Sequence, residues 1–235
     1  MRAVWGTVTG SARVNGDRQA ATASAVRTAA AEKLENMLFY IAHRLVPPAL
    51  DALLSDPSLG ISAFMLPGHV SVIIGEQAYG ALAEHKVPGV ITGFEPLDIL
   101  GGICTILDLL VKGESVVKNA YTRVVRPEGN PQARSLINAT YEPCHAMWRG
   151  IGSLPDSGLA LRQEFARFDA ARHFGLADDE TEMPEGCVCG AIMTGRIGPR
   201  GCSLFGTSCT PESPVGPCMV SSEGSCAAAY RYGDR

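Results

Sequence analysis

Cysteine is the residue type in this sequence most able to carry chemistry, and six of the eight cysteines lie in the last 49 residues, at Cys187, Cys189, Cys202, Cys209, Cys218 and Cys226. Thiolates bind soft metals, and paired thiols form disulfides. The first two form a C-x-C pair, and gaps of 12, 6, 8 and 7 residues follow. Zinc sites usually contain C-x2–4-C pairs, and compact ferredoxin sites contain C-x2-C-x2-C, so neither pattern fits. The spacing alone leaves an iron–sulfur cluster, a zinc site and disulfides open.

Composition and charge narrow the class of protein. The N-terminus is not apolar enough for a signal peptide, so we expect a cytoplasmic chain in which clustered cysteines serve a metal or redox site. The formal net charge is −4 with no dominant basic stripe, which argues against binding nucleic acid by phosphate neutralisation. No run of about 20 apolar residues is present, so we expect no membrane span.

From about residue 31 the sequence alternates between strand and helix patterns. The pattern predicts helices from Pro47 to Asp56 and over 70–85, 96–113 and 130–149. Predicted strands cover 37–42, 61–66, 87–92 and 115–125. Strands that are apolar without alternation are typical of a parallel sheet covered by helices on both faces. We therefore predict an α/β fold with a partial Rossmann-like sheet; without a GxGxxG sequence, nothing supports a dinucleotide site.

Two polar side chains follow predicted strands and precede predicted helices. His69 lies in the loop LPGHVS and Glu95 in the loop TGFEP. Such loops lie at the carboxyl edge of a parallel sheet, where open α/β folds bind ligands. Either residue can equally have a local role, with His69 packing in its loop and Glu95 favouring the helix dipole.

Three regions are expected along the chain. Residues 1–33 are rich in Ala, Ser, Thr and Arg, and we expect a poorly ordered segment or, less favoured, a transit peptide. Residues 34–150 form the α/β domain, and residues 151–235 contain a connection over 151–158, an amphipathic helix over 159–174 and the cysteine-rich module. That module has few large apolar residues, so we expect a metal or a cross-link to stabilise it. Cys104 and Cys144 fall in predicted helices and are assigned no chemistry.

Several segments together resemble the hydrogenase maturation factor HypD family. They are HRLVPPAL at 43–50, LPGHVSVIIG at 66–75, VITGFEPLDIL at 90–100, SGLALRQEFARFDAARHF at 157–174 and the cysteine-rich module at 187–233. The resemblance covers about residues 37–233, in the same order as in the family.

The resemblance implies a maturation factor that helps to assemble the Fe(CN)2CO centre of [NiFe] hydrogenases together with HypC and the cyanide donor HypE. It implies a loop-rich module with a [4Fe–4S] cluster held by Cys187, Cys202, Cys209 and Cys226, beside a redox-active pair formed by Cys189 and Cys218. It also favours His69 and Glu95 as residues of an active crevice. Such a protein is an assembly factor and electron relay rather than a turnover enzyme.

Two departures from the family are visible. The CGGH and CPxC sequences, which the resemblance associates with iron binding and thiol relay, do not occur here. Residues 1 to about 33 match no family sequence, so we expect an N-terminally truncated member that can be inactive, with a first segment foreign to the fold. Two alternative functions remain: a zinc-binding interaction module, and a metal-free thiol–disulfide oxidoreductase.

Overall fold

The computed structural model describes residues 16–148, 150–176 and 183–233. The chain divides into two units. The α/β unit comprises Met1–Leu54, Ser62–Ala146 and Pro155–Ala177, and the cysteine-rich unit comprises Ser55–Ile61, Met147–Leu154 and Asp178–Arg235. The cysteine-rich unit therefore gathers three stretches of chain, whereas the sequence predicted one boundary at residue 150. Among the described helices, none is long and apolar enough to cross a membrane.

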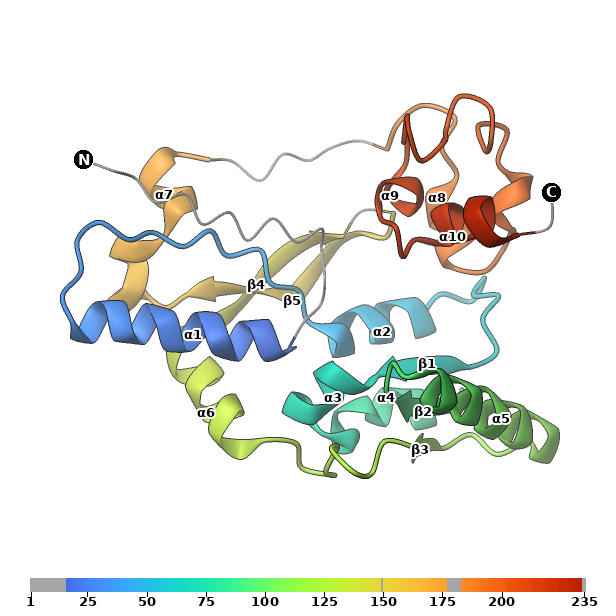
Figure 1. Ribbon diagram of the computed structural model, residues 1–235, viewed down its shortest axis with the longest axis horizontal. Coiled ribbons are helices and arrows are strands. Elements are labelled where there is room, and N and C mark those ends of the chain that lie inside the picture. The colour runs from blue at the N-terminus through green and yellow to red at the C-terminus, as the bar shows by residue number, and fades with distance from the viewer. Residues whose placement is uncertain (1–15, 149, 177–182, 234–235) are drawn as a thin grey trace. The chain divides into compact units, whose positions relative to one another are not determined.

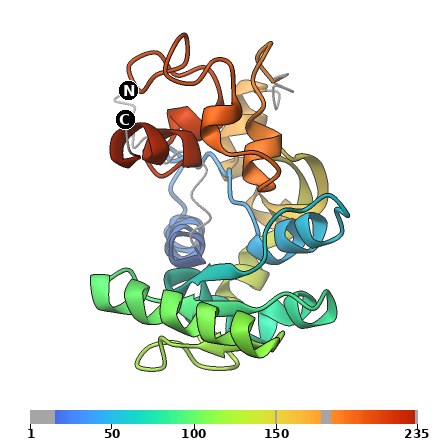
Figure 2. The ribbon, with the colours of Figure 1, turned by 90° about the vertical axis from the view of Figure 1, so that its right-hand side faces the viewer.

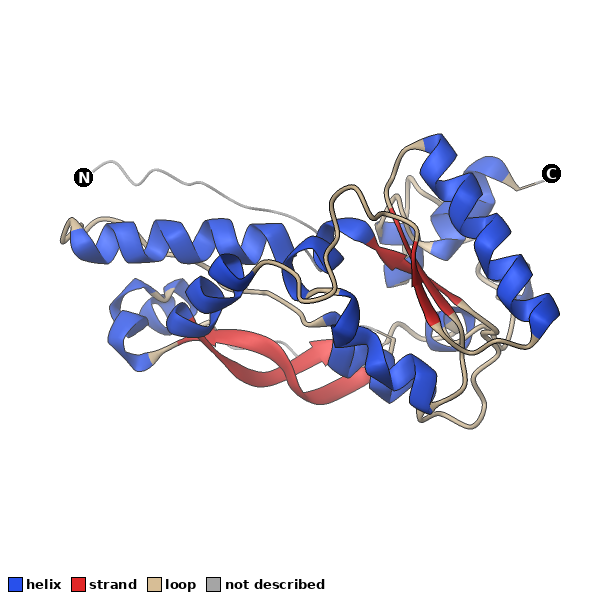
Figure 3. Ribbon diagram, turned by 90° about the horizontal axis from the view of Figure 1, so that it is seen from below, coloured by secondary structure: helices blue, strands red, loops and turns tan. Residues whose placement is uncertain are grey.

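The α/β unit is built around a parallel three-stranded sheet in the order β1-β2-β3 (Figures 1 and 3). The strands are β1 (Phe64–Pro67), β2 (Gly89–Thr92) and β3 (Val117–Asn119). Phe64 pairs with Gly89, and Gly89 with Val117. The predicted strands over 61–66 and 87–92 are thus confirmed in position, whereas the strand predicted over 115–125 is only three residues long.

Helices cover both faces of this sheet, as the sequence predicted. α5 (Pro96–Lys112) packs against β1 and β2 (Figure 2). At this contact Gly102 has no room for a Cβ beside Met65 and Thr92. On the other face, Leu82 of α4 (Gly80–Glu84) lies over Gly89 beside Leu66. Met65 and Leu66 are consecutive in β1, so their side chains point to opposite faces.

Local sequence explains where the helices of this unit begin and end. α5 ends at Gly113, a left-handed residue whose N–H bonds to the carbonyl groups of Leu109 and Leu110. α6 (Pro131–Thr140) begins after Asn130, whose side chain accepts a hydrogen bond from the Ala133 N–H. The helix predicted over 70–85 is interrupted because Gly75 has φ of +86°. Three short elements replace it: α3 (Gly68–Ile74), the 3₁₀ helix η1 (Glu76–Tyr79) and α4.

The segment from residue 130 to 174 differs most from the prediction. Only α6 is helical within 130–149, because β4 (Tyr141–Trp148) follows it directly. β4 pairs with β5 (Gly152–Leu161), which occupies the predicted connection and the start of the predicted amphipathic helix. The rest of that helix is the 3₁₀ helix η2 (Gln163–Phe168) and α7 (Ala170–Phe174). The strand predicted over 37–42 is also wrong, since Phe39 makes an isolated bridge to Asp169 and no strand forms there.

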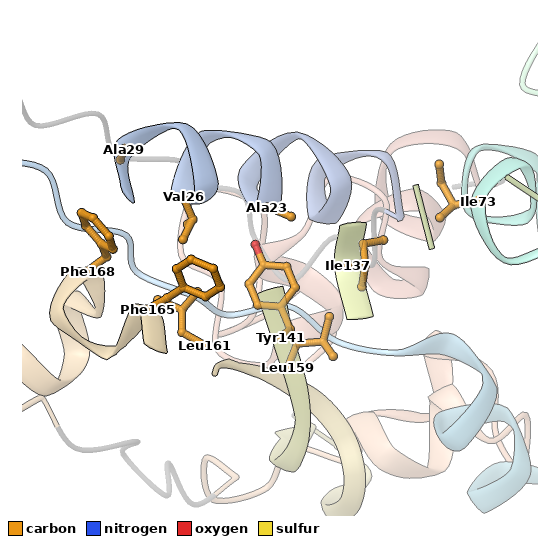
Figure 4. Close-up of a cluster of buried hydrophobic side chains, with 10 residues drawn as sticks. All are labelled: Ala23, Val26, Ala29, Ile73, Ile137, Tyr141, Leu159, Leu161, Phe165 and Phe168. Atoms are coloured by element: carbon orange, nitrogen blue, oxygen red, sulfur yellow. The ribbon is translucent and has the colours of Figure 1, made fainter. Parts of the chain in front are cut away.

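The N-terminal segment belongs to the fold from residue 16 onward. α1 (Gly16–Ala31) packs against α3, α6 and η2, and its Ala23, Val26 and Ala29 are almost fully buried. Figure 4 shows these side chains facing the main apolar core, which also contains Ile73, Ile137, Tyr141, Leu159, Leu161, Phe165 and Phe168. The expectation that residues 1–33 stand outside the fold is therefore corrected for α1, while its part over 1–15 lies outside the described residues.

Helix α2 (Val46–Leu54) completes the α/β unit. It has Pro47 and Pro48 in its first turn, as predicted.

Helix α5 leaves one apolar face exposed. On the face that points away from the sheet, Leu97 is 82% exposed, Leu107 56% and Val111 87%.

Candidate functional site

The six C-terminal cysteines are placed by short helices and tight turns. Cys189 opens α8 (Cys189–Met193), with Cys187 two residues before it. Cys202 follows the 3₁₀ helix η3 (Pro199–Gly201). Cys209 lies in a turn in which its N–H bonds to the Leu204 carbonyl and its own carbonyl accepts the Gly206 N–H.

The last two cysteines lie in the final helices of the chain. Cys218 belongs to α9 (Pro217–Val220) and Cys226 to α10 (Ser225–Tyr232). Proline at the first position of η3 and of α9 favours helix initiation, because its fixed φ suits the first turn and that position needs no N–H donor.

These elements bring all six cysteines to one cavity. The remaining residues that line it are Ile192, Leu204, Phe205, Gly216 and Met219. The lining is therefore sulfur and apolar carbon, a surrounding that suits a soft, electron-carrying group better than a hydrated ion. The aromatic ring of Tyr230 contacts Phe205 edge-on, with 6.1 Å between ring centroids.

The cysteines divide into one pair and four free thiols. Cys189 and Cys218 form a disulfide with Cα atoms 6.2 Å apart, a normal separation for such a bond. Cys187, Cys202, Cys209 and Cys226 are free. This is the same division that the resemblance implied, although the structure itself assigns neither group a role.

Burial and neighbouring thiols oppose ionisation in this cavity. Burial raises the pKa of the Cys226 thiol to about 11, and the Coulombic interaction with Cys202, Cys209 and Cys187 acts in the same direction. Ionising the four thiols together would therefore require positive charge in the cavity. The N–H of Val215 donates a hydrogen bond of 3.4 Å to Cys209 Sγ and supplies part of that stabilisation.

The donor set fits a polynuclear cluster. Four cysteine thiolates are the usual ligands of a [4Fe–4S] cluster, and here they surround one cavity. Within the described ranges, no three His, Cys, Asp or Glu side chains are grouped closely enough to bind a single metal ion.

His69 and Glu95 lie at the carboxyl edge of the three-stranded sheet, where the sequence predicted them. The His69 ring packs on Phe94 at 5.0 Å between centroids, and Glu95 is the N-terminal cap residue of α5. Glu95 Oε2 lies 3.2 Å from the Arg123 guanidinium. Both residues therefore reach the predicted edge, in the α/β unit.

Sequence reasoning missed the groups that organise this edge. Arg123 donates two hydrogen bonds of 2.7 Å to the two oxygens of Asp98, and this contact lowers the pKa of the Asp98 carboxyl. The guanidinium also lies 4.5 Å from the centre of the Tyr121 ring. Gly68 and Gly93 lie so close to that ring that neither has room for a Cβ. Asp98 and Arg123 are 25 residues apart, so no local pattern links them.

The two other cysteines stand apart from this chemistry. Cys104 is in α5, as predicted, but it is exposed rather than buried. Cys144 lies in β4 rather than in a helix and is half-buried.

Comparison with known proteins places the chain in a family. The model "HypD: Hydrogenase formation hypA family" matches residues 18–233. The hydrogenase maturation factor HypD of Rhodobacter capsulatus is 42% identical over 218 residues, which is 90% of this chain and 58% of that protein. A putative hydrogenase expression/formation protein of Methanocaldococcus jannaschii is 41% identical over 200 residues, 85% of this chain and 56% of that protein. The HypD of Escherichia coli is 40% identical over 216 residues, 90% of this chain and 57% of that protein. The chain spans a little over half the length of these relatives.

Proposed function

Because the chain belongs to the HypD family of hydrogenase formation proteins, we propose that it acts in hydrogenase maturation as an iron–sulfur scaffold and electron relay. The observation that carries this proposal is the single cavity lined by four free thiols and one disulfide.

In this proposal Cys187, Cys202, Cys209 and Cys226 hold a [4Fe–4S] cluster. When bound, that group supplies one-electron transfer at a potential set by its surroundings. Burial of Cys209 and Cys226 and the hydrogen bond from Val215 to Cys209 Sγ are this chain's contributions to that potential. Ile192, Leu204 and Met219 exclude water from the same space.

The Cys189–Cys218 disulfide is the two-electron group of the relay. Its reduction breaks one S–S bond, takes up two electrons and two protons, and leaves two thiols. Both sulfurs line the same cavity as the four ligand thiols, so electrons would have a short path. The relay would thus have adjacent sites for single electrons and for an electron pair.

The partners and the cargo follow from the family and belong to the same proposal. We expect docking with a HypC-type chaperone and with HypE, and a role in building the Fe(CN)2CO centre. His69, Glu95 and Arg123 at the sheet edge are the residues of the α/β unit best placed to contact such a partner or its iron cargo.

The decisive experiment is iron and acid-labile sulfide analysis of protein purified without oxygen. We expect about four irons and four sulfides per chain, with a brown colour, in the unmodified protein. Cys202→Ser should lose most of both, while Cys104→Ser, a matched change on exposed α5, should retain them. Stoichiometric zinc with no iron would favour the zinc-binding module, and a full complement of free thiols without metal would favour a thiol–disulfide oxidoreductase.

A further inference from the structure

A neighbouring thiol leaves no room for a side chain at Gly216. Its φ of −100° and ψ of 159° are extended values that any residue adopts, so the backbone does not require glycine here. A Cβ built on Gly216 would overlap Cys187 Sγ and would also touch the Cβ atoms of Cys187 and Cys189. The Cys187 thiol therefore occupies the space that a side chain at position 216 would take.

The Cys189–Cys218 disulfide fixes the position of the contact between Gly216 and Cys187. Cys187 precedes Cys189 by two residues, and Gly216 precedes Cys218 by two residues. The Cys189–Cys218 bond therefore joins two short segments at one point, and the contact between Gly216 and Cys187 joins them again two residues earlier. Because both segments are fixed at the covalent point, their register at the thiol is fixed as well.

The same segment contacts a second free thiol. The N–H of Val215, adjacent to Gly216, donates its hydrogen bond to Cys209 Sγ at 3.4 Å. Residues 215–218 thus contact Cys187 through the shape of Gly216, Cys209 through a hydrogen bond and Cys189 through the disulfide. We name residues 215–218 the positioning segment.

We propose that the positioning segment holds the thiols of Cys187 and Cys209 toward the cavity, and that opening the Cys189–Cys218 disulfide releases Cys187. The assignment of Cys187 as a cluster ligand rests on the proposed function, whereas the positioning of its thiol does not. Reduction by a dithiol reagent breaks the S–S bond, oxidises the reagent to its own disulfide and leaves two protonated thiols. The redox state of the pair would then set how firmly one ligand thiol is held.

Gly216→Ala tests the shape contact, and Gly198→Ala is its matched control. Gly198 lies in the same unit, with φ of −80° and ψ of 162°, and a Cβ there would meet nothing within 4 Å. Metal-free protein with the disulfide intact is treated with iodoacetamide, and the rate at each cysteine is read by peptide mass spectrometry. We expect Gly216→Ala to raise the Cys187 rate several-fold relative to the Cys202 and Cys226 rates, and Gly198→Ala to leave all three unchanged.

The disulfide is tested with the double variant Cys189→Ser/Cys218→Ser. It should raise the Cys187 rate selectively in the same assay, with Cys104 on α5 as the internal reference. Equal rates at Cys187 in Gly216→Ala, Gly198→Ala and the unmodified protein would overturn the proposal. A uniform rise at Cys187, Cys202 and Cys226 would also overturn it, because that outcome shows general unfolding of the unit rather than release of one thiol.

Iron analysis of the same variants separates this inference from the proposed function. If the unmodified protein binds a cluster, Gly216→Ala should contain less iron than Gly198→Ala after reconstitution. If no variant binds iron, the proposed function fails while the alkylation rates still decide whether the segment positions Cys187.

Discussion

Lowering the pH should destabilise the α/β unit through one half-buried histidine, His43. Its Nε2 atom is buried and has no hydrogen-bond partner among the described residues. Its ring meets Tyr141 edge-on at 5.6 Å, and the Tyr141 hydroxyl is likewise buried without a described partner. Burial, and then the positive charge of Arg44, lower the pKa of His43 from 6.5 to about 4. The folded protein therefore favours the neutral ring.

The size of the effect follows from the difference between the two pKa values. The unfolded chain binds a proton near pH 6.5, whereas the folded protein binds it only near pH 4. Between these values the unfolded state holds more protons, so the free energy of unfolding falls as the pH falls. Going from about pH 7.5 to about pH 5 should cost about 2 kcal/mol, and the full loss below about pH 4 should approach about 3 kcal/mol.

Urea unfolding followed by circular dichroism measures this loss between the same two pH values. His43→Phe keeps an aromatic ring beside Tyr141 but removes the titrating group, so its free energy of unfolding should fall about 2 kcal/mol less over the same interval. His145→Gln is the control, because His145 is exposed on β4. It should retain the full pH dependence of the unmodified protein.

The reasoning would be refuted by equal pH dependence in His43→Phe and the unmodified protein. It would also be refuted by a nuclear magnetic resonance titration in which the His43 ring of the folded protein gains its proton near the ordinary pKa of histidine, about 6.5. Either result would mean that water or a movement of the β4 region solvates the ring, and that its burial carries no electrostatic cost.

Five further substitutions test the packing and the exposed surface of the α/β unit. Gly75→Ala should lower the free energy of unfolding by about 1–3 kcal/mol, because Gly75 has φ of +86° and no room for a Cβ. Gly80→Ala should raise it by about 0.5–1 kcal/mol, because Gly80 is the first residue of α4 and a Cβ there meets open space. Urea unfolding measures both changes. Val26→Ala should cost about 2 kcal/mol and the exposed Thr28→Ala almost nothing, whereas an α1 outside the fold would make the two changes equal. Leu107→Lys should reduce aggregation in light scattering while changing stability by less than about 0.5 kcal/mol, and unchanged aggregation would exclude the outer face of α5 as its cause.

The sheet was predictable because its sequence signals are local. Short apolar runs at β1 and β2 are followed at once by Gly or Pro and then by a helix pattern, and both strands lie at the predicted positions. α5 could be placed almost to the residue, since Pro96 and Gly113 mark its two ends. When a segment contains its own start and stop signals, contacts with the rest of the fold change its boundaries little.

The region of β5 shows why the rest was not predictable. The apolar residues from Leu159 to Phe174 suit a helix, yet Ser157, Leu159 and Leu161 alternate on one buried face as in a strand. Phe165 and Phe168 then follow at the spacing of a 3₁₀ turn. Both periods are present in the sequence, and pairing with β4, which no local pattern shows, decides between them.

α1 was missed for a different reason. Most of its buried positions are filled by small residues, so its hydrophobic signal is weak even though Gln19, Ala23, Val26 and Ala29 recur at helical spacing. Small side chains allow close approach to α6 and α3, which is how a weakly apolar helix can cover the core. The periodicity was available in the sequence, but the composition suggested a poorly ordered segment instead.

In the cysteine-rich unit, the cysteines that line the cavity also make up much of the buried core. Of the seven buried core residues that the structure describes in this unit, four are cysteines: Cys189, Cys209, Cys218 and Cys226. The sequence could therefore predict that this module needs a cross-link or a metal, because it contains little else to bury. It could not predict which thiols face one another, since that depends on contacts such as Gly216 with Cys187, which arise only after folding. Because the proposed ligands also form the core, the Cys189–Cys218 disulfide is the cross-link available to hold this unit together when its thiols bind no metal.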